Sequence, residues 1–232
     1  NTTKDKLFSI IAHDLRSPFN TIIGFSDILI ENIDKYEHEK NLKIVKLINK
    51  SAVSTLDILE KLLFWAKSQT GQISFNPTLF PLKQFVYDEL EALTSSAKIK
   101  EIKFRYNQSG EISVYADRNM LSIILRNLIQ NALKYSFHGG EINITSRNNP
   151  SYTEISVSDN GIGMSEEIKN SIFSFDKIIV TSGTEEEKGS GLGLILCQEF
   201  IRKHGGKISV ESEPGTGSTF KITIPMVSGE NS

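Results

Sequence analysis

The sequence predicts an α+β protein, with a two-helix hairpin over residues 1–70 and an α/β sandwich over residues 75–232. Two long segments before Thr70 repeat apolar residues in steps of three and four, which is typical of amphipathic helices. After Gly71 the pattern changes to short strands and helices in a mixed order that does not repeat a βαβ unit. We therefore expect two domains joined by a hinge at residues 71–74.

Composition favours a globular chain of 232 residues with 38% hydrophobic and 23% charged residues. The net charge of −2 gives no reason to expect nucleic acid or an acidic membrane surface as a partner. Cys197 is the only cysteine, which excludes a disulfide framework and fits a reducing compartment. No apolar run is long enough to span a membrane, and the opening NTTKDKLFSI is already helical in pattern. We expect a fragment of a longer protein without a signal peptide.

The first helical segment, residues 4–32, places one histidine away from its apolar seam. On this register His13 points outward, and Asp14 follows it directly. Pro18 lacks a backbone donor, so we expect it to kink or loosen the helix just after the histidine. The seam consists of Ile11, Leu15, Pro18, Ile22, Phe25 and Leu29.

The second helical segment, residues 39–68, pairs with the first through a short polar link. Both apolar stripes are wider than a two-helix seam requires, so two hairpins are expected to form a four-helix bundle. This predicts a homodimer. The alternative is a hairpin that buries its remaining apolar surface against the second domain.

In the second half, strands are expected at residues 73–76, 102–106, 112–115, 141–146, 154–159, 207–211 and 219–224. Helices are expected at residues 81–97, 117–135 and 192–204, with Asp117 as an N-cap. Residues 160–190 show little periodicity.

The helix at 117–135 carries a polar face formed by Asn127, Asn131, Lys134 and Tyr135, at positions i, i+4, i+7 and i+8. Amide oxygens and an ammonium group on one wall suit hydrated Mg²⁺ and the phosphates that carry it. The alternative is the solvated side of an ordinary amphipathic helix.

Two glycine clusters follow this helix. SDNGIGM contains Asp159, Gly161 and Gly163, and KGSGLGL contains Gly189, Gly191 and Gly193. Glycines let backbone approach a ligand, and N–H groups at a helix start suit phosphate oxygens. A buried carboxylate at Asp159 needs a hydrogen-bond donor, and the exocyclic amine of adenine is one candidate. A third cluster, EPGTGSTF, is typical of a hairpin turn.

In this order the motifs resemble those of bacterial sensor histidine kinases of two-component systems. SIIAHDLRSPF resembles their phosphoacceptor box. NLIQNALKYS, DNGIGM, GSGLGL and GTGSTF resemble the ATP-binding boxes of the GHKL fold, which Hsp90-type chaperones and type II topoisomerases share. The resemblance implies a HisKA-type dimerisation and phosphotransfer domain before the hinge and a GHKL-type ATPase domain after it.

The resemblance implies that His13 is phosphorylated by ATP and passes the phosphoryl group to an aspartate of a response regulator receiver domain. Asp14 would orient the imidazole. Ser17 stands where the family usually has threonine or asparagine, which leaves regulator phosphatase activity open. Asn131 would bind Mg²⁺ with help from Asn127. The implied nucleotide contacts are completed by Lys134, Tyr135, Asp159, Gly161, Gly163, Lys177, Gly189, Gly191, Leu192, Gly193 and Thr219.

One departure concerns the segment IFSFDKI, where Phe173 and Phe175 are separated by one residue rather than two. Lys177 replaces the usual arginine and offers a point charge instead of a fork to the γ-phosphate. Slower autophosphorylation is expected, and a nucleotide-binding scaffold with weak or no transfer stays the alternative. A chaperone-like ATPase is disfavoured because such enzymes place a glutamate at the position of Asn127. We expect this fragment to lie in the cytoplasm without contacting a membrane. Whether another part of the protein anchors it to the inner membrane is left open.

Overall fold

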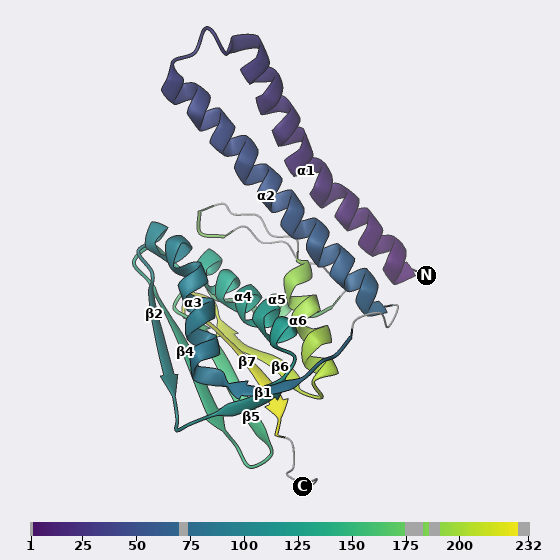
Figure 1. The fold of residues 1–232 in the computed structure, drawn as a ribbon, viewed down its shortest axis with the longest axis vertical. Helices are drawn as coiled ribbons and strands as arrows, with labels where there is room; N and C mark the ends of the chain where they lie inside the picture. Colours follow the sequence, from purple (N-terminus) through teal and green to yellow (C-terminus); the bar gives the residue numbers. More distant parts are fainter. Residues whose placement is uncertain (1, 70–73, 175–182, 186–190, 227–232) are drawn as a thin grey trace. The chain divides into compact units, whose positions relative to one another are not determined.

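The structure is a computed structural model that describes residues 2–69, 74–174, 183–185 and 191–226. The chain forms two compact units, Asn1–Ile73 and Ser74–Ser232 (Figure 1). Across the described residues, no helix is both long and apolar enough to cross a lipid bilayer.

The first unit is a hairpin of two long helices, α1 (Thr2–Asn32) and α2 (His38–Gln69). The Asn41 side chain donates hydrogen bonds to the carbonyls of Ile33 (3.0 Å) and Tyr36 (3.4 Å), which ties the connecting turn to the start of α2. The helices match the predicted segments within two residues. Helix α1 runs without interruption through Pro18, so the expected kink or loosening there stays a prediction.

Each helix of the hairpin has two apolar stripes. One stripe lies between the helices and is partly or fully buried, and its described members include Leu15, Ile22, Phe25, Leu29, Ile44, Ile48 and Leu62. The other stripe is exposed and includes Phe19, Ile23, Ile30, Val45, Leu56, Leu59 and Leu63. Leaving this apolar surface in water is unfavourable, because burying one such side chain would stabilise the protein by about 1.5–3 kcal/mol relative to leaving it exposed.

The second unit contains seven strands and four helices among its described residues. The strands are β1 (Thr78–Pro81), β2 (Lys103–Gln108), β3 (Ser113–Ala116), β4 (Glu141–Asn148), β5 (Tyr152–Asp159), β6 (Lys207–Glu213) and β7 (Gly217–Pro225). The helices are α3 (Leu82–Ile99), α4 (Arg118–Tyr135), α5 (Glu166–Lys169) and α6 (Leu192–Lys203).

Five of these strands form one sheet in the order β2-β4-β5-β7-β6, in which only the β2–β4 pair is parallel. Helices α3, α4 and α6 cover one face of the sheet (Figure 1). Side chains from that face and from the helices form the core, where Leu121, Leu125, Ile144 and Ile155 are fully buried. The other face carries polar residues, as expected for a two-layer sandwich. The register places Asp159 on β5 opposite Ser218 on β7.

The cap predicted at Asp117 is confirmed. Its carboxylate accepts hydrogen bonds from the backbone N–H groups of Asn119 and Met120, both at 3.1 Å. These bonds satisfy donors that the first turn of α4 would otherwise leave unpaired. Helix α4 therefore begins at a fixed point, and its polar face points in a defined direction.

The strand predicted at residues 73–76 is wrong for residues 74–76, and residue 73 lies outside the described part of the chain. The first strand of this unit is β1, which pairs with β3. The Asn76 N–H donates to Asp117 Oδ2 (2.9 Å) instead of to a strand, and Pro77 has no N–H to donate. Helix α5 was not predicted, because four residues are too few to show a period.

Candidate functional site

The polar face of α4 is built as the sequence predicts. Asn127 is buried, and its Nδ2 donates to the Ile123 carbonyl at 2.8 Å. A Cβ atom at Gly193 would lie 2.4 Å from Asn127 Oδ1, so glycine at this position lets the start of α6 approach α4. Asn131, one turn further on, is partly exposed. Asn127 is therefore held in place, whereas the Asn131 amide can reach a ligand.

The last turn of α4 adds a cation and a phenol. The Lys134 ammonium donates to the Tyr135 hydroxyl (3.0 Å) and lies 4.7 Å from the centre of its ring. Both side chains are partly exposed. A cation held in this way can neutralise a phosphate, and the phenol can donate to an oxygen.

Asp159 ends β5 and is 7% exposed. Its Oδ1 accepts hydrogen bonds from the N–H groups of Gly161 (2.9 Å) and Ser218 (3.3 Å). Burial raises the pKa of the Asp159 carboxyl above 3.8, and these two bonds, which favour the carboxylate, offset only part of that effect. Both bonds end on Oδ1, so Oδ2 is the atom that a donor on a ligand would meet.

The glycines after Asp159 are required by close backbone packing. A Cβ at Gly161 would lie 2.1 Å from the Tyr135 carbonyl oxygen, to which the Ile162 N–H donates at 3.1 Å. Gly163 has a φ of +65°, and a Cβ there would lie 1.9 Å from the Glu213 carbonyl oxygen. This loop is thus fixed between the end of α4 and the β6–β7 hairpin, and it brings Asp159 to the same region as Lys134 and Tyr135.

The third predicted element is only partly described. Gly191 is the N-cap of α6 with a φ of +67°, a conformation that favours glycine. Leu192 begins the helix, and its side chain lies outside the described residues, as do Gly189 and Lys177.

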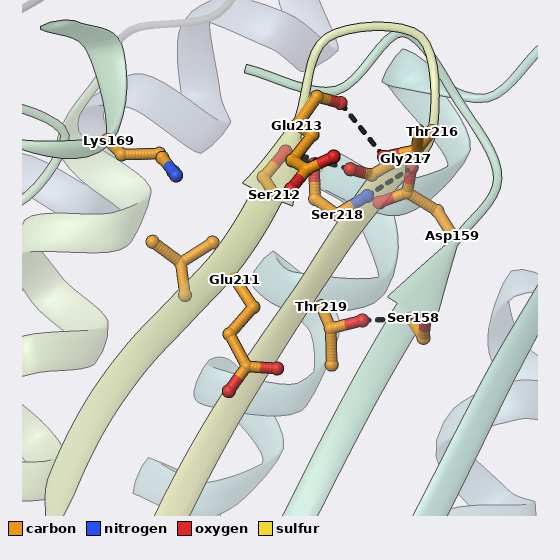
Figure 2. Close-up of a pocket in the computed structure, with 11 residues that line it drawn as sticks. Ser158, Asp159, Lys169, Glu211, Ser212, Glu213, Thr216, Gly217, Ser218 and Thr219 are labelled. Carbon is orange, nitrogen blue, oxygen red and sulfur yellow. Dashed lines mark hydrogen bonds between the residues drawn. The ribbon is translucent and has the colours of Figure 1, made fainter. Parts of the chain in front are cut away.

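The neighbouring residues Ser218 and Thr219 point to opposite faces of β7. Ser218 lies on the face of β7 that Asp159 occupies on β5, and it donates its N–H to Asp159. Thr219 points to the opposite face, where its hydroxyl lies 2.8 Å from the Ser158 hydroxyl (Figure 2). The contact predicted for Thr219 is therefore not supported by its direction. Ser218 was missed, although the two-residue period from Phe220 back to Ser218 could have identified it.

Ser212 was also missed. Its hydroxyl accepts from the Met164 N–H at 2.9 Å and donates to the Gly217 carbonyl at 2.8 Å. It fixes the glycine loop to the β6–β7 hairpin from within β6, and no sequence motif contains it.

A shallow pocket of about 430 Å³ opens at the end of β5, β7 and β6 (Figure 2). It touches Asp159 and Ser218 and extends to Lys169, Glu211 and Thr219. None of the four polar residues of α4 lines it. We therefore define the candidate site by the cluster of α4, Asp159 and the glycine loop, not by this pocket.

In the first unit, His13, Asp14 and Ser17 lie on α1. Ser17 is exposed, and its carbonyl accepts from the Thr21 hydroxyl at 3.1 Å. The side chains of His13 and Asp14 lie outside the described residues.

Family models match both units. One, described as "Histidine kinase-, DNA gyrase B-, and HSP90-like ATPase", matches residues 116–228. Another, described as "His Kinase A (phospho-acceptor) domain", matches residues 3–71. The chain belongs to the sensor histidine kinases of two-component systems. The resemblance and the fold class inferred from the sequence are thereby confirmed.

Individual histidine kinases are similar to this chain over most of its length. Histidine protein kinase DivJ of Caulobacter vibrioides is 30% identical over 94% of this chain and 36% of DivJ. The solved catalytic domain of histidine kinase ThkA is 32% identical, with a TM-score of 0.57 over 66% of this chain and 98% of that domain. ThkA solved in complex with response regulator protein TrrA is 25% identical, with a TM-score of 0.71 over 97% of this chain and 62% of that one. The chain therefore spans about a third of the length of DivJ.

The oxygen atoms that the second unit offers near α4 fit a magnesium ion that is bound together with phosphates. Within the described residues, no group of three or more His, Cys, Asp or Glu side chains could hold a metal ion. Mg²⁺ takes oxygen ligands, keeps several waters and is often bound by one protein oxygen together with substrate phosphates. The partly exposed amide of Asn131 can supply that oxygen, beside the Lys134 ammonium.

Proposed function

We propose that this chain is a protein-histidine kinase core that uses ATP to phosphorylate His13 and then passes the phosphoryl group to an aspartate of a response regulator receiver domain. One observation carries the proposal. A phosphoacceptor match that includes His13 precedes, in the same chain, a nucleotide-domain match that includes Asn131 and Asp159. The ThkA–TrrA complex supports a response regulator as the partner.

In the proposed site, the exocyclic amine of adenine would donate to Asp159 Oδ2, and the glycine loop, which packs against the end of α4, would border the ring. Asn131 would supply an oxygen ligand to Mg²⁺, Asn127 would assist from the preceding turn of α4, and Lys134 and Tyr135 would contact the phosphates. Gly189, Gly191, Leu192 and Gly193 would surround the phosphates, and Lys177 would face the γ-phosphate. Mg²⁺ would neutralise phosphate charge and orient the transferred group.

In the transfer itself, a ring nitrogen of His13 attacks the γ-phosphorus. The new P–N bond forms as the bond to the bridging oxygen breaks, and ADP leaves with that electron pair. Asp14 accepts a hydrogen bond from the other ring nitrogen and stabilises the charge that develops on the imidazole. Most of the rate enhancement then comes from in-line placement and charge neutralisation. The Ser17 hydroxyl, one turn after His13 on α1, would orient water if the protein also dephosphorylates the regulator.

The exposed apolar stripes of the hairpin support a homodimer in which two hairpins form a four-helix bundle. Residues 71–74 would act as the hinge between a dimerisation and phosphotransfer domain (1–70) and a catalytic domain (75–232). We place this core in the cytoplasm, where ATP and a receiver domain are available.

Radiolabelled ATP tests the proposal. Incubation with γ-labelled ATP and Mg²⁺ should give acid-labile, alkali-stable label on the wild type and none on His13→Gln, because the acceptor nitrogen is lost. His38→Gln is the matched control and should label normally, since His38 is exposed at the start of α2. Nucleotide binding without label would indicate a scaffold, whereas phosphate release that persists in His13→Gln would indicate a chaperone-like ATPase.

A further inference from the structure

The end of α4 is held by a residue that belongs to none of the sequence motifs. Lys100 caps the C-terminus of α3 and is 5% exposed. Its ammonium donates to the carbonyls of Leu133 (3.0 Å) and Lys134 (3.1 Å) in the last turn of α4. The carbonyls at a helix end lack partners within the helix and carry partial negative charge, so a buried cation stabilises them.

Thr184 shares this contact. The Lys100 ammonium donates to its hydroxyl at 2.8 Å. The hydroxyl lies 2.8 Å from the Ser136 carbonyl and 3.2 Å from the Lys134 carbonyl, while the Thr184 N–H donates to the Lys134 carbonyl at 3.1 Å. Thr184 is thereby attached to the end of α4 by its backbone and by its side chain.

The turn that Lys100 and Thr184 hold is the one that carries the candidate site. Lys134 and Tyr135 project from it, and the Tyr135 carbonyl accepts from the Ile162 N–H in the glycine loop. A shift of this turn would therefore move the cation, the phenol and the loop that follows Asp159 together. Sites of this kind depend on placement to within a fraction of an ångström.

We infer that Lys100 and Thr184 are positioning residues for the magnesium nucleotide, an inference that rests on the proposed function. The ammonium of Lys100 binds the Thr184 hydroxyl, and the pair fixes the turn from which Lys134 and Tyr135 contact phosphate. Neither residue touches the nucleotide. Their effect reaches it through the carbonyls of α4.

The test uses Thr184→Val, which keeps the shape of the side chain and removes only the hydroxyl, beside Thr184→Ser, which keeps the hydroxyl. Calorimetric titration with Mg²⁺·ATP should show affinity reduced roughly 5- to 20-fold in Thr184→Val, because the part-buried hydrogen bonds of the hydroxyl to Lys100 and to the carbonyls at the end of α4 are lost. Affinity should stay within about twofold of the wild type in Thr184→Ser. The KM for ATP in autophosphorylation should rise in parallel while kcat changes less. Thr145→Val is the matched control, because the Thr145 hydroxyl binds Ser156 on the polar face of the sheet.

Lys100→Met removes the ammonium at similar length and should weaken binding at least as much as Thr184→Val. The double variant should lose less than the two single losses combined, because the two side chains act on one turn. If Lys100→Met fails to fold, the comparison of Thr184→Val with Thr184→Ser still tests the inference. The inference is overturned if Thr184→Val binds like the wild type, or if Thr184→Ser is as weak as Thr184→Val. Failure of the wild type to bind ATP would overturn the proposed function itself, and this inference with it.

Discussion

At the residue scale, Asp159 combines a cost in stability with a requirement for binding. Its raised pKa means that the folded chain holds the proton more tightly than the unfolded chain does, mainly because the carboxyl is buried. Ionisation in the fold therefore costs stability, and the cost grows as the pH rises above 3.8 through the raised value. Asp159→Asn removes this cost but replaces the acceptor Oδ2 with an amide NH2 group, so a donor would face the donating amine of adenine. We expect ATP affinity to fall roughly 10- to 100-fold, with stability at pH 7.5 equal to or above that of the wild type.

Urea denaturation at pH 7.5 and pH 4, with ATP titration at pH 7.5, checks both parts. The stability gain of Asp159→Asn should shrink toward pH 4. Asp88→Asn, at an exposed carboxylate on α3, should change neither quantity. A variant that binds ATP weakly and is also less stable than the wild type at pH 7.5 would contradict the desolvation argument.

His204 is a second residue whose charge state the fold determines. Its Nε2 accepts from the Asp117 N–H at 3.0 Å, and its Nδ1 lies 2.7 Å from the Phe200 carbonyl, which together define a neutral ring. Burial lowers the pKa of His204 below 6.5, against smaller opposing effects of Phe200 and Asp117. The fold therefore holds this ring in its neutral form at the C-terminal end of α6.

Because the pKa of His204 is lower in the fold than in the unfolded chain, its contribution to stability is complete above pH 6.5. It is lost as the pH falls from that value toward the lowered pKa. His204→Gln, which stays neutral, should show a smaller decrease in the free energy of unfolding between pH 7 and pH 5 than the wild type. His138→Gln, at an exposed turn, should keep the slope of the wild type. Equal slopes in all three proteins would refute the assignment.

The site residues differ in how far the sequence could predict them. Asn131, Lys134 and Asp159 follow from periodicity together with the resemblance, because helix and strand periods determine which side chains share a face. Ser218 followed from the same period but was overlooked in favour of Thr219. Lys100, Thr184 and Ser212 could not be predicted, since their contacts join segments distant in the sequence and leave no local pattern.

At the element scale, the glycine loop and α4 form one packed unit. Gly161→Ala would place a methyl group 2.1 Å from the Tyr135 carbonyl oxygen, so the loop and the end of α4 must separate. We expect a loss of roughly 2–4 kcal/mol in the free energy of unfolding and loss of ATP binding. Gly110→Ala separates this clash from backbone strain, because Gly110 has a φ of +75° but open space around it. It should cost roughly 1 kcal/mol and leave ATP binding intact.

The bounds of the long helices, which show several turns of their period, were predicted within about two residues. The segment before β1 was predicted as a strand, but its described residues form none. Ile73 and Phe75 alternate as a strand would, yet Phe75 stacks edge-on against the His204 ring at a centroid distance of 4.9 Å. The Asn76 N–H is bound by the Asp117 side chain. Here tertiary contacts override local propensity, and the start of the second unit is anchored to the end of α6 and the start of α4.

At the scale of the whole molecule, the exposed second stripe of the hairpin predicts association. Leu56 lies in this stripe and is 55% exposed. Leu56→Glu would lose about 1.5–3 kcal/mol of apolar burial in each of two copies, which raises the dimer dissociation constant by roughly 10²- to 10⁴-fold. Sedimentation equilibrium should show monomers for this variant and dimers for both the wild type and Lys50→Glu, which changes charge outside the stripe. ATP affinity should stay unchanged, because the candidate nucleotide site lies entirely in the second unit. If Leu56→Glu sediments like the wild type, the stripe is not the dimer seam.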